Sequence, residues 1–372
     1  MPRIVRVGAG GGEISWQAAL KDLRGDDLLM LAPGFYELPQ GIMLTDVTIK
    51  GTGGMPEDTT IIGYIEVSPD SRFVTLENLC LNPCSDHNAL SIPEKADTYL
   101  SLRNCVIKGN HSDTAAIGAN GKVTLELYGT QIKGGSVSMF AQSDFRIEMA
   151  DSEIDYLSDQ YCALALDGKG TAIINHSQIH GSVNTFESSN CELDFNHSEA
   201  ELMLLHGQTW LNMLDSCLRV KDDAAMQGSD DCYLNIVNCH FDGGIYLEKR
   251  VRAIIQNSYL DRLITVNEVR LHLVATVINS HADFQDQVSC DATRVTFNGQ
   301  SDFQYFLALS GKAQLAGHDL ILNANGSGLT VQDDASFKTN VLASDQARME
   351  VECQKAPNVH ILGVKWDAKK LS

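Results

Sequence analysis

Apolar and polar residues alternate in a ten-residue phrase, CYLNIVNCHF at residues 232–241, which recurs in related forms along the chain. Leu234 and Ile236 alternate with polar neighbours, which is the pattern of a strand with one buried face. Asn238 and Cys239 then form a compact polar corner, and Phe241 turns inward again. Related phrases are VTLENLCL at 74–81, LSLRNCVI at 100–107 and VRAIIQNSYL at 251–260. A repeat of strand, corner and strand predicts a coiled chain, that is, a solenoid.

Three kinds of residue recur once in each repeat. The inward residue after the corner is found at Leu81, Ile107, Ile132, Ile154, Ile179, Ala200, Leu218, Phe241, Leu260 and Ile278, and less cleanly at Phe297, Leu322 and Leu342. In the ten clean coils an apolar residue stands five positions earlier, and in the nine of them from Cys105 to Thr276 a small residue (Cys, Ser or Thr) stands two positions earlier. The nine steps from residue 81 to residue 278 give a mean repeat of about 22 residues. Since paired strands lie ~4.8 Å apart, each kind is predicted to form a row along the axis.

A second strand is predicted in each coil, after a loop of variable length. Examples are residues 162–167, 183–187, 202–206, 224–227, 245–248 and 263–267. A leucine-rich repeat has a similar period, but its asparagine follows the last strand leucine by three residues. Here the asparagine follows by two, as in Ile236 and Asn238, and no helical half-repeat fills the remainder. The pattern therefore favours an all-β parallel β-helix.

The N-terminal segment predicts one short helix. Trp16, Ala19, Leu20 and Leu23 have the spacing of one helical face, and Gly25 follows as a C-cap. The preceding glycines do not complete the dinucleotide fingerprint GxGxxG, because Glu13 stands where its last glycine is needed. We therefore expect the helix to cap the open end of the solenoid.

The segments WQAALKDLRGDDLLMLAPGFYEL, VTIKGTG and TTIIG resemble the N-terminal part of the right-handed parallel β-helix (pectate lyase-like) superfamily. With the repeats that follow, this resemblance covers nearly the whole chain. It implies a single right-handed parallel β-helix domain over residues 1–372, with roughly a dozen coils of about 22 residues. Within it we expect an N-terminal cap and first strands at 1–60, repeating coils at 61–342 and a C-terminal cap at 343–372.

Composition and charge limit the classes of partner that the 372-residue chain is expected to bind. Its net charge of −20 argues against nucleic acid, and no apolar run approaches the length of a membrane span. No signal peptide is recognisable, so the sequence predicts a cytoplasmic protein, or an extracellular one exported by a non-classical route or within an assembly. Ten cysteines without a CxxC pair predict free thiols. No cofactor is predicted.

One polar residue per coil closes the predicted second strand. The row consists of Gln142, Asp167, Glu187, His206, Gln227, Glu248, Asn267 and Gln285. If Asp167 and Glu187 stack at strand spacing, their carboxyl groups suit the acid and nucleophile of a retaining glycosidase, with His206 as a further base. The structural alternative is a ladder of polar side chains at a strand end, with the carboxylates solvated.

A second row lies at the corner, where Asp151, His176, His197 and Asp215 follow one another. Two imidazoles and two carboxylates would suit zinc or manganese chemically. Residues spaced along a flat surface do not converge tetrahedrally, however, so we predict no metal site. The alternative is a ladder of turn residues in which histidines take the place of asparagine.

A third row lies on the outer face of the first strand and contains Glu192, Trp210, Tyr233, Arg252 and Arg270. Adjacent exposed aromatic rings with charged ends suit the stacking of sugar rings or contact with a protein. The sequence therefore predicts a ligand-binding face at these residues. The alternative is that a loop or the C-terminal segment covers Trp210.

The active-site motifs known in the superfamily have no clear match in this sequence. The chain contains the pairs Asp222-Asp223 and Asp230-Asp231, but none of the motifs NTD, GHG, RIK, QAVAL or GTVDFIFG. The leading hypothesis is therefore a non-catalytic protein that recognises a glycan or a protein partner through the Trp210 row. A polysaccharide-cleaving hydrolase or lyase that uses Asp167, Glu187 and His206 is the first alternative. A structural subunit of a larger assembly is the second, and a homo-oligomer is left open.

Overall fold

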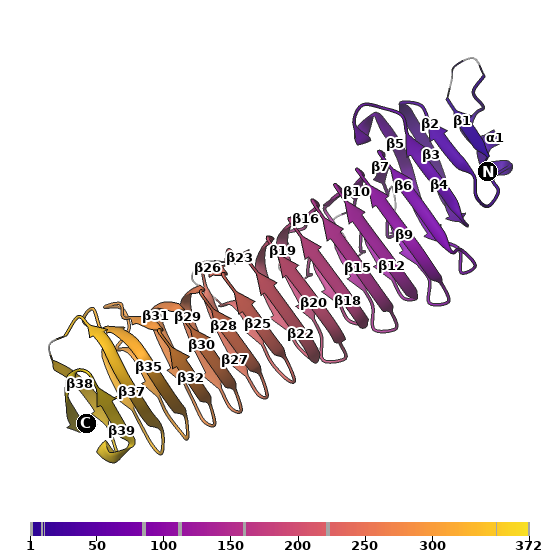
Figure 1. Cartoon of the computed structure of the whole chain (residues 1–372). Coiled ribbons are helices and arrows are strands. Elements are labelled where there is room, and N and C mark those ends of the chain that lie inside the picture. Colours follow the sequence, from indigo (N-terminus) through magenta and orange to yellow (C-terminus); the bar gives the residue numbers. More distant parts are fainter. Residues whose placement is uncertain are drawn as a thin grey trace. The chain divides into compact units, whose positions relative to one another are not determined.

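The computed structural model describes residues 3–8, 10, 12–83, 87–110, 114–158, 161–220, 224–346 and 348–370. Asp222 and Asp223 therefore lie outside the described residues. The chain forms two compact units, unit 1 (Met1–Asp194) and unit 2 (Phe195–Ser372), and β20 (Asn190–Asn196) contains the boundary. Each unit is a right-handed parallel β-helix (Figure 1), which confirms the predicted fold class. The chain makes about 16 turns rather than the predicted dozen.

Three stacks of parallel strands build unit 1. The first stack consists of β1 (Ile4–Val7), β2 (Leu28–Leu31), β4 (Val47–Gly51), β6 (Phe73–Glu77), β9 (Asp97–Arg103), β12 (Lys122–Tyr128), β15 (Asp144–Ala150) and β18 (Lys169–Asn175). The second stack consists of β3 (Gly34–Leu44), β5 (Thr59–Val67), β7 (Cys80–Asn82), β10 (Val106–Lys108), β13 (Gln131–Lys133), β16 (Glu153–Asp155) and β19 (Gln178–Thr185). The third stack joins the ends of β3, β5 and β19 with β8 (Leu90–Ile92), β11 (Ile117–Ala119), β14 (Val137–Met139) and β17 (Leu164–Leu166).

Unit 2 repeats the three stacks. Its first stack consists of β22 (Gln208–Leu214), β25 (Tyr233–Val237), β28 (Arg252–Gln256), β30 (Arg270–Val274), β32 (Ser289–Thr293), β35 (Gln314–Asn323), β37 (Ser336–Ser344) and β39 (Val359–Leu362). The second stack consists of β21 (Glu199–Leu205), β23 (Cys217–Leu218), β26 (His240–Phe241), β29 (Tyr259–Val266), β31 (Val277–Phe284) and β33 (Thr296–Asn298), followed by the ends of β35 and β37. The third stack joins the ends of β21, β29 and β31 with β24 (Ala224–Gly228), β27 (Gly244–Glu248), β34 (Tyr305–Leu309), β36 (Gly328–Val331), β38 (Arg348–Cys353) and β40 (Lys365–Lys370).

The inward rows form the core of each unit. In unit 1, Ile107, Ile132, Ile154 and Ile179 lie in register and are buried, as predicted. In unit 2 the row includes the pair Leu218 and Phe241 and the run Leu260, Ile278, Phe297 and Leu322. Leu342 does not continue it, because the register between β35 and β37 shifts twice. Leu322 consequently pairs with Ser344, and Leu342 is 67% exposed.

A single residue in the left-handed backbone region turns the chain from the first stack to the second. These corner residues have φ between 48° and 57°: Asn78, Asn104, Gly129, Asp151 and His176 in unit 1, and His197, Asp215, Asn238, Asn257, Ala275, Arg294 and Asp319 in unit 2. Gly, Asn and Asp adopt this conformation at little cost, which explains the polar corner of the repeat. Ala275 and Arg294 adopt the same left-handed conformation at a steric cost.

In the coils from Asn104 to Ala275, a small residue follows the corner and completes the turn by hydrogen bonding. In unit 1, the hydroxyl of Ser152 accepts the N–H of Thr130 at 3.0 Å and donates to the carbonyl of Ala150 at 2.8 Å. In unit 2, the hydroxyl of Ser216 accepts the N–H of Ser198 at 3.1 Å. All of these serines and the threonine are buried. The predicted row of small residues is therefore a hydrogen-bonded ladder that satisfies buried backbone groups.

Among the described residues, unit 1 has two short helical elements and unit 2 has one. They are α1 (Trp16–Lys21), η1 (Pro56–Asp58) and η2 (Ala356–Asn358). The hydroxyl of Ser15 caps α1 by accepting the N–H of Ala18 at 3.3 Å, and Trp16 and Ala19 are buried. Trp16 packs edge-on against Tyr36 of β3 at 5.4 Å, so the apolar face of α1 covers the first coils.

Within the described ranges, the helices are all too short and too polar to cross a bilayer. The nine cysteines that the structure describes are free thiols. Burial raises the pKa of several of them, to about 11 for Cys239. These thiols are therefore packing groups rather than nucleophiles at neutral pH.

Candidate functional site

The predicted carboxylate pair of unit 1 does not stack in register. The last paired residues of β17 and β19 are Leu166 and Thr185, so Asp167 lies opposite Phe186 and Glu187 lies one residue further. Glu187 is exposed in the turn that follows β19, and the hydroxyl of Ser188 in this turn donates to Asp167. The expected spacing of the two carboxylates was therefore wrong by one residue.

His206, the third residue of the predicted catalytic set, belongs to unit 2. Its Nδ1 lies 2.7 Å from the hydroxyl of Ser229 and 3.9 Å from a carboxylate oxygen of Asp230. Asp230 is also paired with Lys249 at 2.8 Å, and this hydrogen bond lowers the pKa of Asp230. His206 thus lies in a polar network at the end of the third stack. A catalytic role for Asp167, Glu187 and His206 stays a prediction.

The predicted row of histidines and aspartates occupies the left-handed corner. In unit 1, the amide of Asn104 donates to Asn78 at 2.7 Å, and in unit 2 the amide of Asn238 donates to Asp215 at 3.0 Å. His197 Nε2 lies 3.8 Å from Asp215. These contacts form ladders of turn residues along the axis. In the part of the chain that the structure describes, no three His, Cys, Asp or Glu side chains converge as a metal site would require.

Four residues of the third predicted row lie on one face of unit 2. Trp210, Tyr233, Arg252 and Arg270 are direct partners on β22, β25, β28 and β30, and we call them the Trp210 face. Their positions alternate with buried residues such as Leu211 and so point away from the core. Trp210 is 45% exposed and Tyr233 is 37% exposed, so both rings present surface to solvent. Glu192 is exposed and belongs to unit 1.

The guanidinium groups of the two arginines of the Trp210 face have no hydrogen-bond or ion-pair partner among the described residues. The two side chains are cross-strand neighbours, and Arg252 interacts with Asp231 only through longer-range attraction. Arginines at this spacing repel one another. Two unpaired, adjacent guanidinium groups beside exposed aromatic rings form a surface that a ligand can stabilise by supplying acceptors.

A hollow of about 790 Å³ lies over the Trp210 face. Beside the four residues of the face, it is lined by Asp231, Cys232, Arg250, Glu268, Gln287 and Ser289. Arg250 forms a two-point pair with Asp231, at 2.7 and 3.0 Å, which lowers the pKa of Asp231. The row of side chains that contains Asp231 and Arg250 was not predicted from the sequence, although its residues recur at regular spacing. Asp231, Arg250, Glu268 and Gln287 each stand two residues before a residue of the outward row that forms the Trp210 face, namely Tyr233, Arg252, Arg270 and Ser289.

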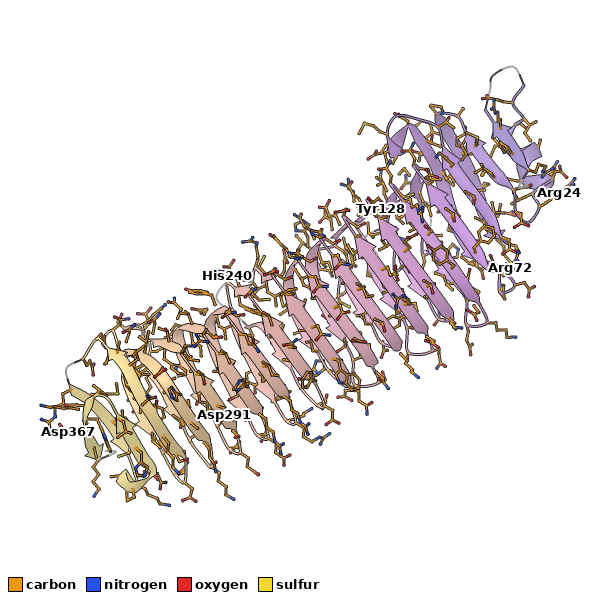
Figure 2. All side chains as sticks on the ribbon, viewed as in Figure 1. Arg24, Arg72, Tyr128, His240, Asp291 and Asp367 are labelled. Atoms are coloured by element: carbon orange, nitrogen blue, oxygen red, sulfur yellow. The ribbon has the colours of Figure 1, made fainter. Side chains whose placement is uncertain are left out.

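A row of hydrogen-bonding side chains borders the Trp210 face on its other side. It begins with Asn212 and Asn235, where the side-chain amide of Asn235 donates to Asn212 at 3.5 Å. Ile254 interrupts the row, which then continues with His272 and Asp291. Asp291 is labelled on this face in Figure 2. The aromatic rings are therefore flanked by charged groups along one edge and by amides along the other.

No protein-family model matches the sequence, and no curated protein matches it either. Among solved structures, the A-module of the mannuronan C-5 epimerase AlgE6 from Azotobacter vinelandii aligns over 95% of this chain and 93% of its own, with 12% identity and a TM-score of 0.27. The pectate lyase Pel9A aligns over 99% of this chain and 78% of its own, with 10% identity and a TM-score of 0.17. At these TM-scores, neither superposition supports a conclusion about the function of this chain.

Proposed function

We propose that the chain binds a glycan with acidic groups through the Trp210 face of unit 2. The observation that carries this proposal is the in-register row of two exposed aromatic rings and two unpaired arginines. Aromatic side chains pack against the apolar faces of sugar rings. Guanidinium groups bind carboxylates and sulfates by paired hydrogen bonds. A ligand that follows the axis meets one of these groups every ~4.8 Å.

The local charge of this face differs from that of the whole chain. Arg250, Arg252 and Arg270 outnumber Asp231 and Glu268 by one, whereas the chain as a whole carries −20. The surrounding negative charge disfavours a dense polyanion. A glycan with separated acidic groups on a neutral backbone fits both the arginines and the flanking amides.

The chemistry of the hollow favours binding over cleavage. A glycosidase needs one carboxyl group with a raised pKa, which serves as the acid, and a second as base or nucleophile. The pKa of Asp231 is instead lowered by Arg250. The hollow is also more polar than the core of a typical protein–protein interface. A protein partner and a polysaccharide-cleaving activity are therefore outcomes that the experiment has to separate from glycan binding.

The proposal can be tested by titrating the protein with a hexasaccharide in which glucuronic acid alternates with a neutral sugar and with xylohexaose that carries one glucuronic acid branch, with the dense polyanions hexagalacturonic acid and N-sulfated heparin for comparison. Binding of an acidic hexasaccharide that weakens with salt and is lost in Trp210→Ala and in Arg252→Gln/Arg270→Gln is expected. Arg219→Gln is the matched control, because it removes one arginine from the second stack of the same unit. If all acidic oligosaccharides fail to bind, or if they bind equally well to the double variant, the proposal is wrong.

The same titrations decide between the alternatives. Release of new reducing ends, or of unsaturated products, that disappears in Asp167→Asn and Glu187→Gln would replace the binding proposal with the catalytic one. Light scattering at high protein concentration tests the structural-subunit alternative, which requires an oligomer. A monomer that binds no glycan would contradict that alternative and the proposal together.

A further inference from the structure

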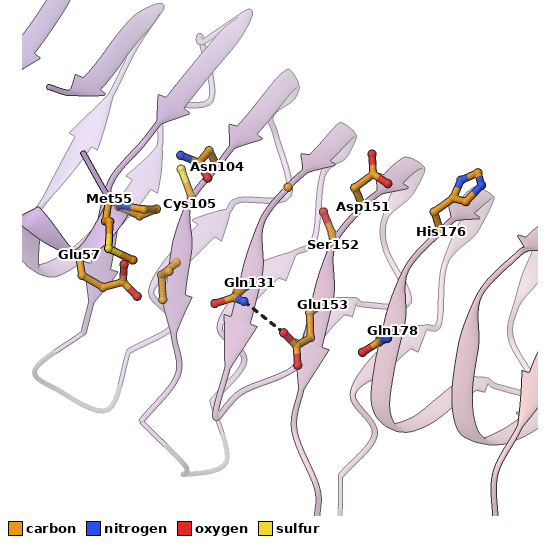
Figure 3. Close-up of a pocket in the computed structure, with 13 residues that line it drawn as sticks. Met55, Glu57, Asn104, Cys105, Gln131, Asp151, Ser152, Glu153, His176 and Gln178 are labelled. Atoms are coloured by element: carbon orange, nitrogen blue, oxygen red, sulfur yellow. Dashed lines mark hydrogen bonds between the residues drawn. The ribbon is translucent and has the colours of Figure 1, made fainter. Parts of the chain in front are cut away.

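Unit 1 contains a separate hollow of about 540 Å³ on the outer side of the second stack, shown in Figure 3. We call it the Gly129 hollow. Its lining residues are Met55, Pro56, Glu57, Asn104, Cys105, Val106, Gly129, Gln131, Asp151, Ser152, Glu153, His176 and Gln178. It has no residue in common with the Trp210 face, and an inference about it is independent of the proposed function.

The floor of the Gly129 hollow is a row that begins with the buried Val106 and continues with three hydrogen-bonding side chains. Val106, Gln131, Glu153 and Gln178 are successive partners on β10, β13, β16 and β19. The amide of Gln131 donates to Glu153 at 3.3 Å, the contact drawn in Figure 3. An extended ligand along this row would meet amide, carboxylate and amide groups in turn, ~4.8 Å apart.

A missing side chain creates the room above this floor. The corner row along the hollow has side chains at Asn104, Asp151 and His176, but Gly129 interrupts it. A Cβ added at Gly129 would have no atom within 4 Å. The fold does not need glycine for space here, and with φ at 57° asparagine fits the same backbone. The glycine therefore leaves the hollow open where every neighbouring coil fills the same place.

A short turn closes one end of the hollow. Met55 and Glu57 lie at the end opposite His176 and Gln178 (Figure 3). This wall is held in place by hydrogen bonds, because Asp58 accepts the N–H of Met55 at 2.9 Å and Thr60 donates to the carbonyl of Glu57 at 3.1 Å. The remaining lining residues all belong to coils that follow this turn. A linear ligand on the floor therefore has to begin at the wall.

The charges around the hollow are weakly negative. Glu57, Asp151 and Glu153 line it, and Lys108, Lys133, Asp155 and His180 form the next row on the same face, so four carboxylates stand against two lysines. Glu153 also lies 3.3 Å from His180. This field disfavours an anionic ligand. The hydrogen-bonding groups instead suit a ligand with neutral donors and acceptors.

We propose that the Gly129 hollow binds the terminal sugars of a neutral glycan chain. Hydroxyl groups of a sugar donate to Asp151 and Glu153 and accept from the amides of Gln131 and Gln178. Met55 and Pro56 supply apolar surface for the faces of the rings. The wall at Met55–Glu57 makes the site specific for a chain end, because a chain that continued would collide with it.

The test uses the full chain and neutral hexasaccharides of the cello, xylo, manno and malto series, measured by saturation-transfer NMR and calorimetry. At least one series is expected to bind, and Gly129→Asn is expected to weaken its binding by about tenfold or more, since the added side chain occupies the hollow. Ala275→Asn is the matched control, because it places asparagine at the same corner position in unit 2.

A competition experiment tests whether the Gly129 hollow recognises the end of a glycan chain. At equal sugar-residue concentration, the hexasaccharide should compete far better than the long polymer of the same series, because it presents more ends. Equal competition by the polymer would overturn end recognition. Binding that Gly129→Asn leaves intact would overturn the site, as would failure of every neutral series at millimolar concentration. Binding of spermine or of inorganic phosphate in the hollow would overturn the neutral class of ligand.

Discussion

Replacing Trp210 by alanine removes the largest ligand-facing surface of the Trp210 face. A tryptophan side chain offers up to about 250 Å² of surface, and 45% of Trp210 is exposed. Roughly 110 Å² is thus available to a ligand, which at about 25 cal/mol per Å² corresponds to at most ~2.8 kcal/mol. A sugar ring that covers only one face of the indole takes up about half of this area, or ~1.4 kcal/mol. We therefore expect Trp210→Ala to weaken binding of the acidic hexasaccharide between about tenfold and hundredfold.

Calorimetric titration of the parent protein, Trp210→Ala and Trp210→Phe measures this loss. The phenylalanine variant should retain part of the affinity, because a smaller ring still covers the sugar. Tyr128→Ala is the matched control, since Tyr128, labelled in Figure 2, is 56% exposed on unit 1 and lies off the Trp210 face. Circular dichroism and the melting temperature confirm that each variant is folded. An unchanged Kd in folded Trp210→Ala would refute the stacking argument.

Three further predictions concern the scaffold. Ala275→Asn should raise the free energy of unfolding by about 1 kcal/mol, seen as a higher urea midpoint, because alanine is strained at φ 50° and asparagine is not. Ser216→Ala should lower it by roughly 1–3 kcal/mol, because the buried N–H of Ser198 loses its acceptor, and an unchanged midpoint would show that the ladder contributes nothing. The hydrogen bond from Arg3 lowers the pKa of Asp27, so this carboxylate stabilises the fold above its unfolded pKa of about 3.9 and ceases to do so as the pH falls through its folded pKa. The stability difference between the parent and Asp27→Asn should therefore be largest near neutral pH and shrink in acid, and a pH-independent difference would contradict this linkage.

The rows of the core could be predicted because each depends on a short local pattern. Apolar residues on both sides of a polar corner are visible in a ten-residue window, and the left-handed turn selects asparagine, aspartate or glycine at that corner. The coil count was too low because the outer coils lack this signature. β2 and β4, for example, precede the first corner asparagine at Asn78. Leu342 was wrongly placed in the core row, because the two register shifts between β35 and β37 cannot be recognised from the spacing of apolar residues in the sequence.

The candidate sites were harder to predict than the core. Trp210, Tyr233, Arg252 and Arg270 are regularly spaced within straight strands, so counting residues brought them into register. Asp167 and Glu187 follow connections of different length. β16 and β17 are joined by a loop, whereas β19 bends at Gly181 and continues from one stack into the next. A shift of one residue changes the partner of every side chain, so Asp167 and Glu187 are not direct partners.

The sequence by itself determined the parallel β-helix, because the buried rows and the one-residue corners are set by side-chain size and backbone preference within each repeat. Only the tertiary structure decided which outward residues share a surface. The partners of the Trp210 face are about 20 residues apart in the chain and meet across stacked coils. The room above Gly129 and the wall at Met55 likewise exist only after the coils have stacked. Side chains at solvent-facing positions do not contribute to the packing energy of the core, so the repeat does not constrain which residues stand there. Their function depends on which other side chains lie beside them after the coils have stacked.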